Sequence, residues 1–335
     1  MRTRQRIAAA AAALLACAMT VGLAGCNGQP PVLATSSSSS ETPDLSVAQE
    51  RSIRHRILGG ITKANKAKST EGLDRYMSGP ALAIRSSEIT IAKSTGSLDA
   101  KTTIPSGAVQ TVIPTESGWP RSVFTITTTT ADQQSKRLLV MRQDSARSNY
   151  RLWAVARLFQ GAELPKFEIA SLGSTQGTDT DSGLVATPAQ AVARYADVLE
   201  KGSSSTYAAQ FSDDYFRQDL ATLSSTVEEG MERNDGTQSQ SFTPVTDQIA
   251  VMRSTDGGDL VVARIDSTWI RKAGSGRQSL PASDAEKVLF GNGTATSTMA
   301  VSYVNVIALY IPHAGTGEKI TAVGAERQPV KVEAR

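Results

Sequence analysis

The chain has 335 residues, more than twice the roughly 150 residues typical of one domain, with 40% hydrophobic and 20% charged residues. This composition is globular and excludes a disordered or fibrous chain. Two cysteines exclude a disulfide-rich scaffold and a multi-cysteine zinc site. An aromatic content of 5% is too low for a surface that stacks single-stranded nucleic acid.

The first 26 residues predict secretion and lipid attachment. Three arginines precede the apolar run Ile7–Leu23, which ends in Leu23-Ala24-Gly25-Cys26. This order is that of a secretory signal peptide, and the last four residues resemble a bacterial lipobox, whose cysteine takes a diacylglyceryl thioether. We therefore predict a signal peptide over residues 1–25 and an extracytoplasmic protein anchored in the cell membrane through Cys26. The alternative is that the apolar run stays as a membrane span, for which it is short.

Removal of this signal peptide changes the charge of the protein. The chain has 35 Lys and Arg against 32 Asp and Glu, and the loss of three arginines leaves 32 of each. A neutral mature chain has no excess of basic residues for nucleic acid, so we expect no nucleic-acid partner. Cys17 leaves with the signal peptide and Cys26 is used by the lipid, so we also expect no disulfide.

Residues 26–44 are expected to form a flexible tether behind the anchor. They contain Pro30-Pro31, the run Ser36–Ser40 and Pro43, without apolar periodicity. Such a segment cannot repay the entropy of ordering. A coil of this length has a root-mean-square reach of roughly 20–25 Å.

The first long segment, residues 45–170, predicts helices followed by strands. Ser46 and Gln49 have the spacing of a capping box, and Ile53, Ile57 and Ile61 follow at helical spacing. A second helical stretch is expected over 71–92, with a break near Gly79. Four strands are expected at Gln110–Ile113, Arg121–Thr130, Arg137–Gln143 and Tyr150–Leu158, with residues 144–149 as a hairpin connection.

The second segment, residues 187–335, repeats this order. Thr187 caps a helix, Pro188 occupies its first turn and Gly202 ends it. Another helix is expected from about Asp213 to Met231, with its inward stripe at Phe216, Leu220, Leu223 and Val227. Strands are expected at Phe242–Met252, Leu260–Lys272, Thr296–Ile311 and Lys319–Val332, and the turn signal Asp256-Gly257-Gly258-Asp259 separates the first two.

Helices that precede antiparallel strands indicate an α+β fold. The pattern resembles two tandem cystatin-like or nuclear-transport-factor-like rolls, in each of which a curved sheet wraps a long helix. We predict a first domain over 45–170, a linker over 171–186 and a second domain over 187–335. The alternative is one large α+β domain without duplication.

Three stretches of the first segment resemble a known protein family. They are Gly79–Arg85, Trp119-Pro120-Arg121 and Gln143–Trp153. They are similar to an uncharacterised family of actinobacterial lipoproteins. The resemblance implies a Gram-positive envelope, and it implies no activity that can be carried over.

The sequence contains few groups suited to catalysis or metal binding. His55 lies between two arginines of the first helix and is expected on a solvated face, and His313 is expected in a loop. No nucleophile elbow or phosphate-binding loop is found. Asp179–Gly183 begins like a calcium loop, but the twelfth position is Gln190, so a linker is expected there. We expect no metal and no cofactor.

One polar cluster is a candidate site. Arg85 lies in the second predicted helical stretch, after the break near Gly79. Asp144 and Arg147 lie in the hairpin connection. One interpretation is a structural ion pair or turn cap. The other is a ligand site, in which the arginines pair an anionic group and Asp144 orients them.

These observations favour a non-catalytic, lipid-anchored extracytoplasmic protein that binds or organises a partner protein or polymer at the bacterial envelope. The scarcity of catalytic groups motivates this hypothesis. Two alternatives remain open: a solute-binding lipoprotein of a transporter, and an envelope hydrolase that uses carboxylates.

Overall fold

The computed structural model describes residues 42–115, 118–130 and 135–335, which all belong to one compact unit of the chain. The predicted signal peptide, Cys26 and the tether up to residue 41 lie outside the described residues. No helix of the described part combines the length and the apolarity that crossing a bilayer requires.

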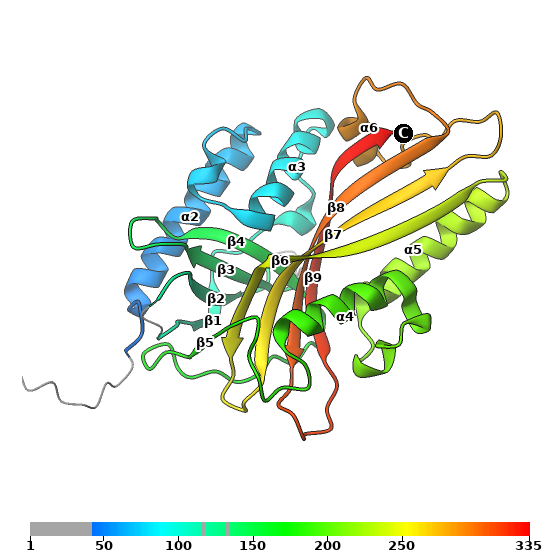
Figure 1. Cartoon of the computed structure of the whole chain (residues 1–335). Coiled ribbons are helices and arrows are strands. Elements are labelled where there is room, and N and C mark those ends of the chain that lie inside the picture. The colour runs from blue at the N-terminus through cyan, green and yellow to red at the C-terminus, as the bar shows by residue number, and fades with distance from the viewer. Residues whose placement is uncertain (1–41, 116–117, 131–134) are drawn as a thin grey trace, which may run out of the picture. The chain divides into compact units, whose positions relative to one another are not determined.

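The first half of the unit places two long helices before four strands (Figure 1). Short 3-10 turns at Leu73–Arg75 and Ala100–Thr102 follow the two helices. The elements are α2 (Val47–Ala67), α3 (Gly79–Thr95), β1 (Ala108–Val112), β2 (Arg121–Thr127), β3 (Arg137–Gln143) and β4 (Arg151–Leu158).

The second half repeats this order with longer strands. Two-residue strand β5 (Gln176–Gly177) precedes its helices, and a short helix separates two of its long strands. The elements after β5 are α4 (Pro188–Lys201), α5 (Tyr215–Glu232), β6 (Thr237–Arg253), β7 (Asp259–Lys272), α6 (Asp284–Phe290), β8 (Thr298–Ile311) and β9 (Thr321–Ala334).

All described strands join one curled antiparallel sheet of order β1-β2-β3-β4-β9-β8-β7-β6-β5. The α+β prediction is therefore confirmed. The two halves meet at their last strands, where only Arg157 pairs with Ala325 and Leu158 with Gly324. By contrast, β7 and β8 pair along their whole length from Asp259 to Lys272.

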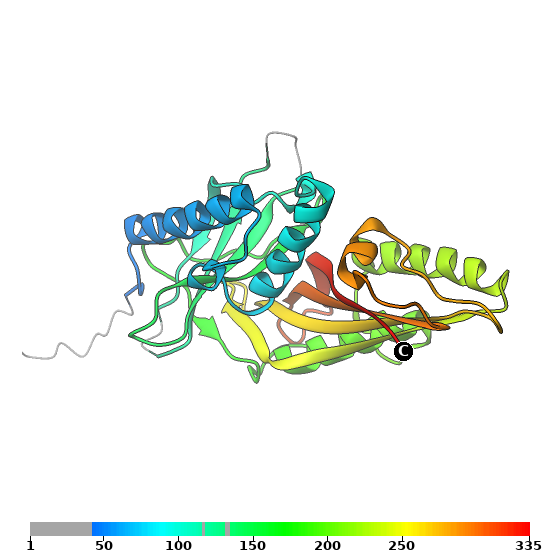
Figure 2. The same cartoon turned by 90° about the horizontal axis from the view of Figure 1, so that it is seen from above.

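The core consists of layers, with helices outside and the two half-sheets inside (Figures 1 and 2). One face of β1–β4 packs against α2 and α3, and one face of β6–β9 packs against α4 and α5. The remaining faces meet in a shared core that includes Phe124, Val140, Met252, Val262 and Val306. This differs from the expectation that each sheet wraps only its own helix. Runs such as Leu138–Met141 are apolar on both faces, so both must be covered.

Most local predictions are confirmed. The capping box predicted at Ser46–Gln49 forms, and Thr187 caps α4 as predicted, there through a capping box with Gln190. The hairpin connection after β3 and the glycine turn after β6 occupy their predicted places, with Gly257 at φ 84°. The predicted strands agree with β1–β4 and β6–β9 to within a few residues, except that β6 begins five residues early.

Two local expectations need correction. The break expected near Gly79 is where α3 begins, but the residues before it hold the 3-10 turn Leu73–Arg75 in place of an α-helix. On α5, Phe216 and Leu220 are buried, but Leu223 is 45% exposed because the helix end extends past the core. The Gly59-Gly60 pair leaves α2 continuous; at Gly60 a Cβ atom would overlap the Tyr76 ring, so glycine permits close packing.

Candidate functional site

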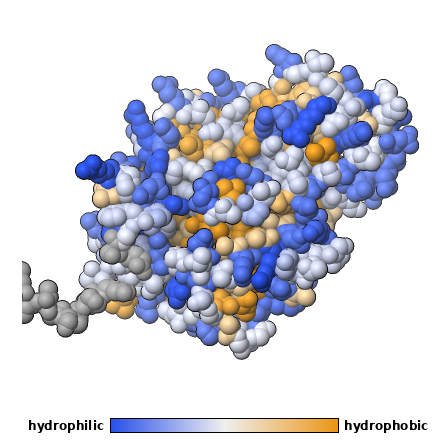
Figure 3. Space-filling model, in the orientation of Figure 1, coloured by the Kyte–Doolittle hydropathy of each residue, from blue (hydrophilic) through white to orange (hydrophobic). Residues whose placement is uncertain are grey.

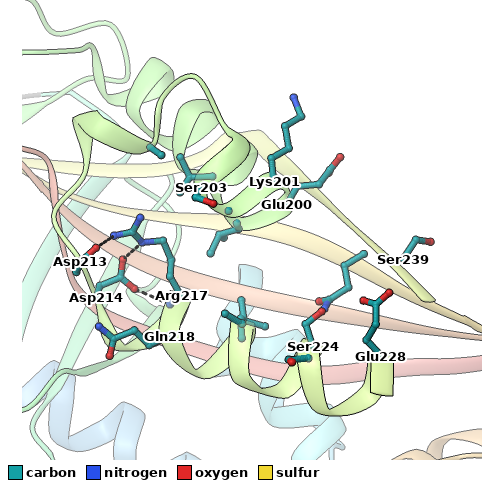
Figure 4. Close-up of a pocket in the computed structure, with 18 of the residues that line it drawn as sticks. Glu200, Lys201, Ser203, Asp213, Asp214, Arg217, Gln218, Ser224, Glu228 and Ser239 are labelled. Atoms are coloured by element: carbon teal, nitrogen blue, oxygen red, sulfur yellow. Dashed lines mark hydrogen bonds and ion pairs between the residues drawn. The ribbon is translucent and has the colours of Figure 1, made fainter. Parts of the chain in front are cut away.

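A surface cavity of the second half lies between α4, α5 and the start of β6 (Figure 4). It measures about 680 Å³. Figure 4 shows Glu200 and Lys201 on its α4 side, and Gln218, Ser224 and Glu228 on its α5 side. We call this cavity the β6 groove; the lining residues used below are Glu200, Lys201, Asp213, Asp214, Arg217, Ser224, Glu228, Gln238, Ser239 and Gln240.

Helix ends build the walls of the β6 groove. The helix α4 ends at Gly202, whose φ of 56° is easily adopted by glycine. After two short turns, Asp214 caps α5 by accepting from the Arg217 backbone N–H at 2.9 Å. The same aspartate accepts from the Arg217 Nε at 2.7 Å. This bidentate use of Asp214 fixes the entrance to α5.

The floor of the groove is an incomplete sheet edge. The short strand β5 pairs only with Val251 and Met252 of β6, so residues 237–244 have no described strand on their outer side. The Phe242 N–H donates to Glu200 Oε2 at 3.0 Å, which shows that it points away from β7. Because strand groups alternate, the backbone N–H groups of Gln240 and Gln238 point the same way.

This edge keeps one unpaired polar site. The next backbone position that faces outward along β6 is Pro244, which has no N–H group. Gln238 is held by Ser224 and Glu228 and accepts from the Trp269 indole. By contrast, the side-chain Oε1 of Gln240 is buried without a hydrogen-bond partner among the described residues. A buried acceptor without a partner is costly, so this position is suited to a ligand donor.

Each carboxylate of the β6 groove is engaged by the protein. Asp214 and Asp213 contact Arg217, Glu200 accepts from β6, and Glu228 accepts from Gln238 at 3.0 Å. The groove lining has four acidic residues against Lys201 and Arg217. Its chemistry therefore favours donors and cations over anions.

The structure does not bring the predicted cluster together. Arg85 is buried in α3, where its Nε lies 3.1 Å from Glu88 and its Nη2 donates to the Thr102 carbonyl at 2.8 Å. No described hydrogen bond or ion pair joins it to Asp144 or Arg147. Burial of Arg85 against its own helix explains why it does not reach the hairpin.

At the hairpin, Asp144 pairs with two other arginines and not with Arg147. Asp144 pairs with Arg142 at 3.1 Å and with Arg151 at 2.8 Å, and both arginines flank it on β3 and β4. Arg147 is exposed and makes no described hydrogen bond or ion pair. Asp144 follows the end of β3, and its two partners lie on the adjacent strand ends of β3 and β4. Arg147 lies in the turn, so it does not take part in this ion pair.

The histidines lie where the sequence indicated. His55 is exposed on α2, and His313 is exposed in the connection after β8. The Asp179–Gly183 stretch holds Asp181 against Arg253 at 3.0 Å. No group of three metal-ligating side chains is found within the described residues.

A buried charge cluster lies at the junction of the two halves. Glu88 of α3, Arg137 of β3 and Glu326 of β9 border an internal cavity of about 20 Å³, which is room for one water. Glu326 also pairs with Arg157 at 3.0 Å. Burial raises the pKa of Glu88 to about 7, although Arg85 opposes this, and burial also raises the pKa of Glu326.

Glu88→Gln is expected to weaken the pH dependence of stability. Between pH 4.5 and 7 the folded protein keeps a proton on Glu88 that the unfolded chain has released, so the free energy of unfolding falls as pH rises. The pKa difference corresponds to at most about 3 kcal/mol. Urea unfolding at pH 5 and pH 8 should show a smaller difference for the variant.

The control for this measurement is Glu229→Gln on the exposed side of α5. It should keep the wild-type difference between the two pH values. Glu326 remains in both variants, so a residual slope is expected. A Glu88→Gln protein with an unchanged slope would contradict the assignment.

Sequence reasoning missed the β6 groove and the buried cluster. A signal for the groove existed in Gln238–Ser241, a run of polar residues at the start of a strand that ends in the apolar run Ile249–Met252. The cluster had no local signal, because Glu88 and Glu326 lie far apart in the chain. Trp153 and Trp269 are buried in the sheet, whereas Trp119 is exposed beside Arg121.

Comparison with known protein families matches residues 62–331 to a family described as a domain of unknown function, DUF8094. The match covers both half-sheets and the β6 groove. No curated protein and no solved structure matches the chain.

Proposed function

The chain belongs to the DUF8094 family, and we propose that it is a non-catalytic lipoprotein of an actinobacterial envelope, anchored through Cys26, that binds an extended segment of a partner protein in the β6 groove. The lipobox supports the anchor, and the resemblance around Gly79–Arg85 supports the envelope setting. The observation that carries the binding role is the outer edge of β6 over residues 237–244, which has no described strand beside it.

An extended peptide can add to such an edge as a further strand. In that mode the backbone groups of Gln238 and Gln240 would pair with the peptide backbone. The buried Oε1 of Gln240 would accept one further donor. Lysine or amide side chains of the peptide would suit the acidic lining. A partner segment with donors and cations is therefore the ligand class proposed.

The non-catalytic part of the proposal rests on the engaged carboxylates. A hydrolase acid and base need free, facing carboxyl groups. In the β6 groove Asp214 is used as a helix cap and an ion-pair partner, and Glu200 is used as an edge cap. These roles favour a binding surface over the hydrolase alternative.

Gln240→Pro is expected to reduce partner binding about tenfold, the equivalent of one lost hydrogen bond of about 1.4 kcal/mol. The proline removes the outward N–H and leaves the ladder to β7 intact, as Pro244 does nearby. The measurement is the yield of partner cross-linked in cells to a photoreactive residue placed at Ser239. Ser239 is exposed at the groove (Figure 4).

Gln240→Thr is the matched control, since it removes the side-chain amide and keeps the backbone N–H. Its cross-linking yield should exceed that of Gln240→Pro. Equal yields from wild type and Gln240→Pro would contradict binding at the edge. A purified protein stabilised by small solutes alone would instead favour the solute-binding alternative.

The proposal includes the tandem architecture. The strand order supports a duplication, because two four-stranded meanders meet at equivalent last strands, β4 and β9, and two long helices precede each meander. In this view residues 45–170 and 187–335 are related rolls joined by the linker 171–186. The shared core between them would then be the interface of the duplicated halves.

A further inference from the structure

Exposed apolar side chains gather where the described chain begins. Ten large hydrophobic residues are exposed in the described part, and five of them are either part of α2 or lie on segments that border its start. Their exposed fractions range from 41% to 65%. We call these five residues the entry patch: Val47, Val109, Trp119, Ile169 and Leu172.

Contacts connect the aliphatic members of the entry patch to the start of α2. Val47 and Val109 line one cavity of about 640 Å³ together with Ala170. Ile169 precedes Ala170, and Leu172 precedes Gly173, whose backbone lies against Pro43. The segments that carry these side chains therefore border α2 and the first described residues of the unit.

Trp119 is connected to Asp44 through the side chain of Arg121. Its ring lies 4.6 Å from the Arg121 guanidinium, and Arg121 lies 3.3 Å from the Asp44 carboxylate. Trp153 and Trp269 are each only 4% exposed. Trp119 is thus the single exposed tryptophan of the three in the chain.

Basic side chains border the patch. Arg51 and His55 are exposed on α2 and line the same cavity as Val47 and Val109. Neither makes a hydrogen bond or ion pair within the described residues. Long cationic side chains can lie along apolar surface with the charged end in a polar layer. Figure 3 shows hydrophobic patches among hydrophilic side chains on the face it presents.

We propose that the entry patch rests on the lipid bilayer in which Cys26 is anchored, an inference that depends on the proposed function. Only 16 residues separate Cys26 from Pro43, so the patch stays within a short reach of the anchor and has a high effective concentration at the surface. Tryptophan and aliphatic side chains enter the membrane interface, and Arg51 is placed to meet lipid phosphates.

In the test, the protein is attached to lipid by a chemical coupling at Cys26. The mature chain, residues 26–335, has Cys26 as its one thiol and contains the whole compact unit. It is coupled through this thiol to maleimide-headgroup lipid in phosphatidylcholine vesicles whose acyl chains are brominated. We expect quenching of about a third of the tryptophan emission, the share of Trp119, because this ring enters the interface.

The variant Val109→Ser/Ile169→Ser/Leu172→Ser should lose this quenching and remain folded, since all three side chains are exposed. The control Leu223→Ser/Leu280→Ser, on α5 and before α6, removes exposed side chains at the other end of the unit and should keep it (Figures 1 and 2). Unquenched Trp119 in the tethered wild type would overturn the proposal. Protection of Trp119 without vesicles, through self-association, would also overturn it.

Because the anchor is supplied in vitro, this outcome is independent of lipidation in cells. Failure of quenching with normal lipid labelling of Cys26 would reject the entry patch alone. Quenching without lipid labelling in cells would reject the anchor and leave the affinity of the patch for lipid standing.

Discussion

The variant Cys26→Ser is expected to lose nearly all membrane retention. The serine hydroxyl cannot form the thioether that the lipobox Leu23–Cys26 predicts. Without lipid, the protein should accumulate as an uncleaved precursor or be shed. Stable attachment needs two or more acyl chains, since a single chain gives marginal binding. The measurement is the fraction of protein that sediments with membranes after an alkaline wash, together with metabolic fatty-acid labelling.

Cys17→Ser is the matched control for this experiment. It makes the same cysteine-to-serine change at the other cysteine of the chain, which lies inside the apolar run Ile7–Leu23 and not in the lipobox. We expect it to keep both the label and the membrane fraction. If Cys26→Ser protein remained in the membrane after the wash to the same extent as wild type, the lipobox interpretation would be wrong.

The local elements were predictable because their signals lie within a few residues. Ser46 and Gln49, or Thr187 and Gln190, form their capping boxes through side chains three residues apart. The β-branched run in β2 and the glycine turn after β6 are also local. Short α6 was missed, although Ser283 caps it, because seven residues offer too little periodicity.

The arrangement of the sheet depends on long-range pairing and was only partly predictable. Two meanders were expected, but nothing in β4 or β9 alone indicates that they pair with each other. Their contact covers two residue pairs, so it leaves no long complementary pattern in the sequence. The run Leu138–Met141 is apolar on both faces, which is the condition for a shared core, but the expected rolls did not make use of this signal.

The candidate site was less predictable than the fold. Polar residues that lie close in the sequence suggested Arg85, Asp144 and Arg147, but burial placed the first in the interior and left the last in solvent. The β6 groove depends on where α4 ends beside a strand edge some 40 residues later. Proximity of that kind arises from tertiary packing, which sequence spacing does not encode.

Arg85→Ala is expected to destabilise the protein by about 3–5 kcal/mol at pH 8, because it leaves Glu88 as a buried charge without its nearest cation. It also removes the donor to the Thr102 carbonyl. At pH 5 the cost should be smaller, since the pKa of Glu88 is raised by burial and the protonated form carries no charge. Urea unfolding at both pH values measures this.

Arg147→Ala provides the comparison, because this arginine is exposed and makes no described ion pair. Its effect on the free energy of unfolding should stay within about 0.5 kcal/mol. The double variant Arg85→Met/Glu88→Leu removes both charges and should be more stable than Arg85→Ala at pH 8. Equal unfolding free energies for Arg85→Ala and Arg147→Ala would show that the α3 pair does not stabilise the junction between the half-sheets, since in that case Glu88 would have found another partner or water.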